Sequence, residues 1–255
     1  HHNIIVIDNR FISERVNQIR NWNMEFIHGN ILDKELVNKV FKDCDVVHHL
    51  AGVTEVPRTK SESTSEKDDK IKLVAEQGTQ NILDAINKNC KIVFPSTHVV
   101  FEGMEKVKND IEENEETKPV LSYSSSKAIN EKQLKNSGKN YIILRLGSVY
   151  GYSTDTTRID IMPNLFSKIA SQNGTINLFS GGKQIKSLVP LIDVARCMKF
   201  MAENPRLNKE TFNLTKESIT VKEVAEICKK INPKLSIKVT NDETPNLGYT
   251  LSNKK

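Results

Sequence analysis

The sequence predicts an α/β fold, with a doubly wound parallel sheet followed by a smaller C-terminal lobe. Short apolar runs alternate with helical segments through the first 150 residues. Polar side chains follow these runs directly, at the carboxyl ends of strands, where such sheets bind their ligands. The last third is different, because glycines and prolines interrupt the pattern before one more helical run.

The first fifty residues indicate a β-α-β-α-β order. The opening run NIIVID is apolar and ends in a carboxylate, which is typical of a strand buried on both faces. The expected elements are a strand at 3–8, a helix from about Ser13, a strand at 24–28, a helix at 33–42 and a strand at 45–50.

The next hundred residues continue the alternation. A polar stretch at 61–70 is either loop or helix start. The expected elements after it are a helix at 71–87, a strand at 91–94 and a strand at 141–146. Strands alternating with helices of this length favour right-handed crossovers in one parallel sheet.

From Gly151 on, the pattern becomes loop-rich. The glycines and prolines concerned are Pro163, Gly174, Gly181, Gly182 and Pro190. A helix is expected at 221–231. We therefore expect a smaller lobe that closes over the strand ends.

Composition narrows the class of protein. The chain has 255 residues, 37% of them hydrophobic, which suffices for one large core. Its net charge of +5 comes from lysines interleaved with acidic residues, which indicates a solvated surface and no nucleic-acid partner. The sequence shows neither an apolar run of membrane-spanning length nor a signal-like leader, so we expect a cytoplasmic protein without a membrane partner.

Cysteine and histidine spacing predicts no metal site. The four cysteines lie far apart, without paired spacing. His48 and His49 are adjacent on an expected strand, so their side chains should point to opposite faces.

Tyr123 and Lys127 form the sharpest chemical pattern. Residues four apart lie on one face of a helix. An ammonium beside a phenol favours the phenolate, which makes tyrosine a usable base near neutral pH.

Several segments, in order, resemble the extended short-chain dehydrogenase/reductase family, whose members include NAD-dependent nucleotide-sugar epimerases and dehydratases. The matching segments are HLAG at 49–52, PSTHVVFEG at 95–103, YSSSK at 123–127, LRLGSVYG at 144–151 and GKQIK at 182–186 with DVA at 193–195. The resemblance covers nearly the whole chain. It implies a Rossmann-like cofactor domain at 1–150 and a mainly substrate-binding lobe at 151–255, with 187–203 packing back on the first domain.

Carried over position by position, the resemblance implies the site residues. The catalytic residues would be Thr97, Tyr123 and Lys127. The cofactor would be bound by Asp8, Asn9, Asn30, Ile31, Leu50, Ala51, Gly52, Ser96, Tyr123 and Lys127. The substrate would be bound by Thr97, Asn164 and Lys186, with Arg158 as a weaker candidate.

The implied cofactor is NAD. A carboxylate at Asp8 would accept hydrogen bonds from the adenosine ribose and repel a 2′-phosphate. Arg10 nearby keeps NADP open. Asn30 stands where the family more often has Asp, and Lys186 stands where it has a diphosphate-binding Arg, so Lys186 would act as a point charge.

One expected segment is missing from the pattern. The family begins with a strand and a Gly-rich turn that bind the cofactor pyrophosphate, and this sequence opens at what resembles the second strand. We therefore expect a chain that is incomplete at its N-terminal end and also stops early, with Ile5 and Ile7 uncovered. Alone it should bind NAD poorly and aggregate.

The residues after Thr97 narrow the reaction. Family dehydratases have Asp-Glu there, and the decarboxylases resemble them in requiring Glu, whereas this chain has His98 and Val99. The expected function is an NAD-dependent nucleotide-sugar epimerase, most simply a 4-epimerase, and the intact protein is expected to be a homodimer. The alternatives are an NAD(P)H-dependent 4-keto-sugar reductase or dehydrogenase and a non-catalytic, nicotinamide-sensing regulator.

Overall fold

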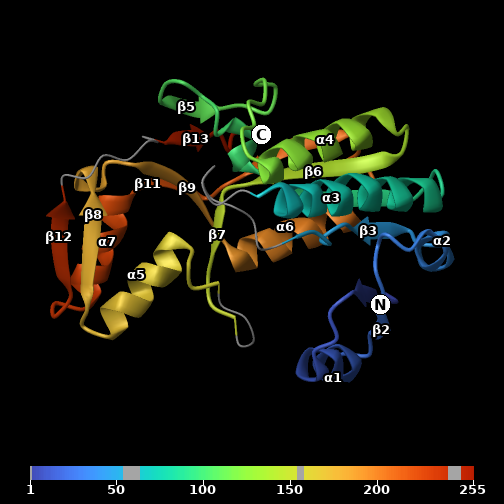
Figure 1. Cartoon of the computed structure of the whole chain (residues 1–255), viewed down its shortest axis with the longest axis horizontal. Coiled ribbons are helices and arrows are strands. Elements are labelled where there is room, and N and C mark those ends of the chain that lie inside the picture. The colour runs from blue at the N-terminus through green and yellow to red at the C-terminus, as the bar shows by residue number, and fades with distance from the viewer. Residues whose placement is uncertain (1, 54–63, 154–157, 241–247) are drawn as a thin grey trace. The chain divides into compact units, whose positions relative to one another are not determined.

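The structure is a computed structural model that describes residues 2–53, 64–153, 158–240 and 248–255. The chain divides into two compact units of three segments each. The first unit comprises residues 1–95, 119–143 and 205–210, and the second comprises 96–118, 144–204 and 211–255. Both α-helices and parallel strands are present, which confirms the expected fold class (Figure 1).

The first unit follows the predicted β-α order. Its elements are β1 (Ile5–Asp8), α1 (Ser13–Asn21), β2 (Glu25–His28), α2 (Lys34–Phe41), β3 (Val46–His48), α3 (Ser65–Ala85), the greater part of β4 (Lys91–Thr97), α4 (Ser122–Asn136) and the start of β6 (Asn140–Leu146). α2 and α3 each begin at a side-chain cap. Asp33 accepts from the backbone N–H of Leu36, and Thr64 accepts from that of Lys67. The polar stretch before residue 71 is therefore a helix start in its described part.

The parallel strands lie in more than one sheet. One sheet has the order β10-β6-β4-β3, where β10 spans Glu210–Leu214, and β3 pairs with β4 in parallel from Val46 opposite Lys91. β1 and β2 pair in parallel with each other in a separate two-stranded sheet. Ile5 of β1 is 43% exposed, whereas Ile7 packs against the core.

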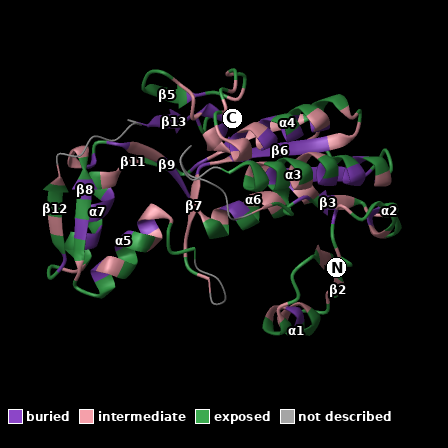
Figure 2. Cartoon of the chain, in the orientation of Figure 1, coloured by how far each residue is buried: buried purple, intermediate pink, exposed green. Residues whose placement is uncertain are grey.

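One hydrophobic core serves the first unit. α3 and α4 lie side by side (Figure 1), and both helices carry buried residues, as do β4 and β6 along most of their length (Figure 2). The core includes Phe41, Ile82, Ile92, Phe94, Leu134 and Ile143. Burial of such aliphatic and aromatic side chains is the main favourable contribution to folding, at about 1.5–3 kcal/mol for each large residue.

The second unit contains most of the later elements. They are η2 (His98–Phe101), β5 (Lys108–Ile111), β7 (Ser148–Tyr150), α5 (Met162–Ser171), β8 (Thr175–Phe179), η3 (Ser180–Gly182), β9 (Ile185–Pro190), α6 (Leu191–Glu203), β11 (Glu217–Thr220), α7 (Val221–Ile231), β12 (Ser236–Thr240) and β13 (Tyr249–Leu251). Among them, α5 and α7 pack together and against β8, around a core that includes Phe166, Leu178 and Leu235.

The expectation of a loop-rich last third is wrong. Pro163 lies in the first turn of α5, and Pro190 is the N-cap of α6, so both prolines mark helix starts. Proline is tolerated there because the first turn has no internal partner for its N–H. The helix expected at 221–231 is present with those bounds, capped by Thr220 and Glu223. None of the described helices is long and apolar enough to cross a membrane.

Candidate active site

Tyr123 and Lys127 lie one turn apart at the start of α4. The Lys127 Nζ atom is 5.9 Å from the centroid of the Tyr123 ring, so the two side chains share a face as predicted. The small neighbours Ser124 and Ser126 are buried on this helix, and the Ser124 hydroxyl donates to the carbonyl of Leu121. The helix start therefore presents the phenol and the ammonium together.

Lys127 is held at the end of β4. Its Nζ atom donates a hydrogen bond of 2.8 Å to the Pro95 carbonyl and lies 4.4 Å from the ring centroid of Phe94. Loss of hydration lowers the pKa of Lys127 to about 8, with Glu131 acting in the opposite direction. The ammonium is thus charged at neutral pH and becomes neutral at moderately alkaline pH.

β4 itself carries the expected hydroxyl pair. β3 pairs with Lys91–Val93 only, so Pro95, which has no N–H, lies beyond the part of β4 that β3 covers. Ser96 is buried, and Thr97 is half-buried. The Thr97 hydroxyl oxygen accepts from the backbone N–H of Val99 at 3.3 Å, which caps η2 and leaves the hydroxyl hydrogen available as a donor.

His98 occupies the position where a dehydratase would have its acid. Its Nε2 atom lies 3.3 Å from the hydroxyl of Ser148, and its backbone carbonyl accepts from the hydroxyl of Tyr249 at 2.9 Å. Burial and the nearby Lys186 lower the pKa of His98 to about 4. At neutral pH this side chain is uncharged and is engaged within the second unit.

His49 lies under the turn that was expected to contact the cofactor. It is buried while its neighbour His48 is exposed, as alternation along a strand predicts. Its Nε2 atom is 2.8 Å from the hydroxyl of Thr79, and its ring lies against Phe94. Burial and the Lys127 charge lower its pKa to about 3, so it is neutral. After it, Leu50 is 64% exposed, and Ala51 and Gly52 are also exposed.

The expected ribose and adenine residues lie in the first unit. Asp8 ends β1 with an exposed side chain, and its Oδ1 atom accepts from the backbone N–H of Arg10 at 2.8 Å. The backbone carbonyl of Asn9 lies 3.1 Å from the Nε2 atom of His28. These contacts leave the second Asp8 oxygen available to a ribose hydroxyl.

Asn30 and Ile31 differ in what they offer a ligand. The Asn30 side chain accepts from the N–H of Leu32 and forms a local turn. Ile31 is a core residue against Gly78, and its carbonyl accepts from Asn81. Of the two side chains, that of Asn30 is therefore exposed to a ligand, whereas that of Ile31 is buried.

The two expected substrate residues outside β4 also differ. Asn164 of α5 accepts from the N–H of Gly151 and donates to the carbonyl of Arg158, so its amide supports the local backbone. Arg158 is exposed and pairs with Asp160 at 3.2 Å. Lys186 of β9 is half-buried, and loss of hydration lowers its pKa, which an incoming anion would reverse.

Sequence reasoning missed the aromatic ring beside Lys127. The pattern singled out polar side chains after strand ends, whereas Phe94 looks like any buried strand residue. The signal was available in part, because Phe94 comes directly before Pro95 and side chains alternate across a strand.

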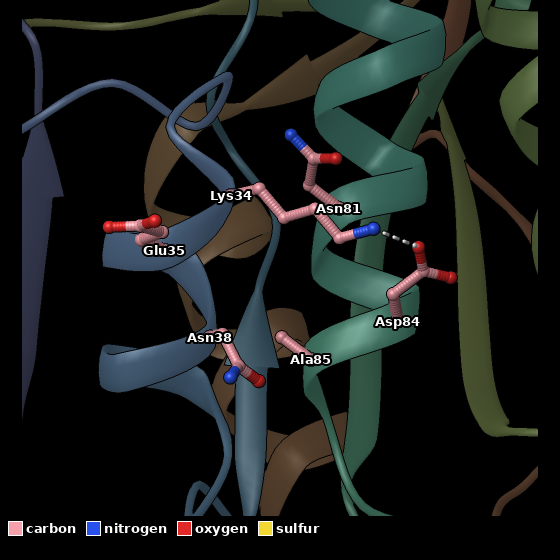
Figure 3. A pocket seen from close by; sticks show the side chains of 6 residues that line it. All are labelled: Lys34, Glu35, Asn38, Asn81, Asp84 and Ala85. Atoms are coloured by element: carbon pink, nitrogen blue, oxygen red, sulfur yellow. Dashed lines mark ion pairs between the residues drawn. The ribbon is translucent and has the colours of Figure 1, made fainter.

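A cavity of about 340 Å³ in the first unit is separate from these residues. It is lined by Lys34, Glu35, Asn38, Asn81, Asp84 and Ala85, between α2 and α3 (Figure 3). Lys34 and Asp84 pair across it at 3.6 Å. None of the predicted site residues lines it, so we do not count it as part of the candidate site.

Comparison with known proteins identifies a sequence family that matches most of the chain, and relatives within it. The sequence model of the NAD-dependent epimerase/dehydratase family matches residues 1–215. A dTDP-D-glucose 4,6-dehydratase of Dictyostelium discoideum is 26% identical over 212 residues, which are 75% of this chain and 47% of that protein. A UDP-N-acetyl-alpha-D-glucosaminuronate decarboxylase of Bacillus cytotoxicus is 25% identical over 88% of this chain and 71% of its own length. The chain therefore spans about half the length of the first of these relatives.

Solved structures with the same fold include sugar-nucleotide epimerases. A UDP-glucose 4-epimerase of Thermotoga maritima, solved with UDP-glucose, has a TM-score of 0.80 at 20% identity and covers 98% of this chain and 81% of its own. A UDP-glucuronic acid 4-epimerase of Bacillus cereus, solved with UDP-glucuronic acid and NAD, has a TM-score of 0.77 at 21% identity, over 98% of this chain and 82% of its own. At these identities the likeness establishes the fold.

Proposed function

The chain belongs to the NAD-dependent epimerase/dehydratase family, and we propose that it acts as a 4-epimerase on a nucleotide-linked sugar. The observation that carries this proposal is the Tyr123/Lys127 pair, with the Lys127 ammonium 2.8 Å from the carbonyl of Pro95. This hydrogen bond holds Lys127, the partner of the expected base, against β4, which also carries Ser96 and Thr97.

The residues of this pair have complementary roles. Tyr123 takes the proton of the sugar hydroxyl as the carbon is oxidised, and returns a proton when the carbon is reduced. The Lys127 ammonium stabilises the phenolate by its charge. The Thr97 hydroxyl, which keeps its hydrogen for donation, holds the oxygen of the reacting carbon.

The described residues fit a bound nicotinamide dinucleotide. Lys127 keeps N–H donors beyond the one that Pro95 uses, and the turn at Leu50–Gly52 is exposed to a ligand. Asp8 and Asn9 would hold the adenosine ribose, Asn30 the adenine, and Ser96 the nicotinamide half. When bound, NAD supplies the hydride acceptor and donor. A carboxylate at Asp8 favours NAD over NADP.

The residues after Thr97 disfavour dehydration and decarboxylation. Elimination needs an acid and a base beside the sugar, and Val99 supplies neither. His98 is neutral at pH 7 and is engaged with Ser148, so it is a poor acid. Reversible oxidation without elimination remains as the chemistry that these side chains support.

Lys186 is the proposed anchor for the substrate diphosphate. It is a half-buried cation, and loss of hydration lowers its pKa. A diphosphate would stabilise the charged form through a charge-assisted hydrogen bond. We further propose that residues 1–150 mainly bind the cofactor, that residues 151–255 mainly bind the substrate, and that the intact protein is a homodimer.

Interconversion of UDP-glucose and UDP-galactose by the full-length protein, with added NAD and no reductant, tests the reaction. The parent should interconvert them, whereas Lys127→Met should lose both turnover and NAD affinity. Lys132→Met removes an exposed lysine of the same helix and should change neither. Consumption of NADH with a 4-keto sugar, without interconversion, would identify a reductase instead. NAD binding without either reaction would indicate a sensor.

A further inference from the structure

Phe94 has the aromatic ring nearest to the Lys127 ammonium among the described residues, and the Tyr123 ring lies farther away at 5.9 Å. The Nζ atom lies 4.4 Å from the ring centroid, within the range of about 6 Å for an attraction between a cation and a ring face. Phe94 is 1% exposed and belongs to the core of the first unit, so solvent does not weaken this attraction. We propose that Phe94 is a positioning residue for the reaction, whose ring holds the Lys127 ammonium charged and in place beside Tyr123; this rests on the proposed function.

The ammonium needs such support because it has lost hydration. Its hydrogen bond to the Pro95 carbonyl uses one of three N–H donors. Loss of hydration already lowers the pKa of Lys127 to about 8. Glu131 raises it from the next turn of α4, but the Glu131 carboxylate is also 3.6 Å from the Lys135 ammonium. The ring is therefore a main remaining source of stabilisation for the charge.

His49 contacts the same ring, and its protonation state affects the Lys127 ammonium. Its centroid lies 5.5 Å from that of Phe94, and its Nε2 atom is 2.8 Å from the Thr79 hydroxyl. A proton on His49 would add a second positive charge near Lys127. Its pKa of about 3 keeps it neutral at any pH where the enzyme would work. Among the described residues, Glu131 and His49 thus interact electrostatically with Lys127, and the Tyr123 ring lies 5.9 Å from its ammonium.

The proposal predicts how the charge responds to loss of the ring. An attraction of this kind corresponds to a shift of about half a unit to one and a half units in the pKa of the cation. Phe94→Leu and Phe94→Met keep an apolar side chain but remove the ring face. Both should lower the pKa of Lys127, whereas Phe94→Tyr should preserve it. Phe41→Leu is the matched control, because Phe41 is 7% exposed and belongs to the same core.

The test is a pH titration of the folded protein by NMR with lysine labelled with ¹³C and ¹⁵N. The Lys127 signal is the one that Lys127→Met removes. A lower pKa in Phe94→Leu or Phe94→Met, with no change in Phe41→Leu, is the expected result. An unchanged pKa in either folded Phe94 variant overturns the proposal. If Phe94→Leu does not fold, Phe94→Met and the ring-retaining Phe94→Tyr still give the comparison.

Kinetics then separate this inference from the proposed function. In Phe94→Leu and Phe94→Met the alkaline fall of kcat should move to lower pH by the same shift as the pKa of Lys127, with KM for the sugar nucleotide little changed. A lowered pKa with an unchanged pH profile overturns the positioning role. If the parent turns over none of the sugar nucleotides, the proposed function fails, while the NMR result still decides whether Phe94 supports the charge.

Discussion

The phenol of Tyr249 donates a hydrogen bond of 2.9 Å to the backbone carbonyl of His98, 151 residues earlier in the chain. The Tyr249 ring also packs on the His98 ring, with centroids 5.6 Å apart, and on that of Phe101. Burial, with a smaller contribution from Glu102, raises the pKa of Tyr249. Strand β13 therefore fixes the residue that directly follows Thr97.

Tyr249→Phe should lower the free energy of unfolding by about 1 kcal/mol, because it leaves the partly buried carbonyl of His98 without this donor. Urea denaturation measures the change. Tyr152→Phe is the control. Tyr152 is 81% exposed, so loss of its hydroxyl should leave the free energy of unfolding unchanged. Equal stability of the two variants would mean that water replaces the lost donor.

Tyr123→Phe should reduce turnover at least roughly a hundredfold while leaving folding and NAD binding near normal. The hydroxyl is the proposed base, and the ring that remains still fills its place on α4. Turnover of sugar nucleotide and NAD titration, together with circular dichroism, measure the three properties. Retention of most of the activity would assign the proton transfer to another group.

Stability should fall in acid because of His49. The unfolded imidazole binds a proton below about 6.5, whereas the folded one does so only below about 3, so between these values the unfolded state binds more protons. The contribution of neutral His49 is therefore complete above 6.5 and is lost as the pH falls. His49→Gln should be less stable at pH 7 but should lose less stability between pH 6.5 and 4. Parallel pH dependence of the two urea midpoints would contradict this.

Asp8→Ala should weaken NAD binding and reduce the preference for NAD over NADP by roughly tenfold, because the carboxylate is the proposed source of 2′-phosphate repulsion. Isothermal titration of both cofactors measures the ratio. Asp43→Ala removes another exposed carboxylate and serves as the control. An unchanged ratio would leave Asp8 with only its hydrogen bond to Arg10.

Local pattern was enough to predict most elements of the first unit. The alternation of apolar runs and helical segments gave α1 and β4 their positions, and the four-residue spacing of Tyr123 and Lys127 gave their common face. Element ends moved by a few residues where a cap decided them, as Thr64 does for α3. The later strands escaped prediction because β9 pairs with both β7 and β11, which lie far from it in the sequence.

The family pattern could not predict which site side chains form hydrogen bonds with the protein backbone rather than facing a ligand. The family pattern names side chains, and it predicted Tyr123, Lys127 and Thr97 on that basis. It could not show that the Asn164 amide would bind the backbone of Gly151 and Arg158. Nor could it place Ile31 in the core against Gly78, because one residue letter does not say which face of a turn is buried.

The Pro95 acceptor also affects which substitutions the site can accept in evolution. Its carbonyl belongs to the peptide backbone, so any residue at position 95 that keeps the path of β4 would supply the same oxygen to Lys127. Drift at position 95 is thus compatible with the contact, whereas drift at position 127 is not. Homologues should accordingly vary at position 95 more freely than at Lys127. A comparison of their residue types would therefore not reveal the backbone acceptor of this hydrogen bond.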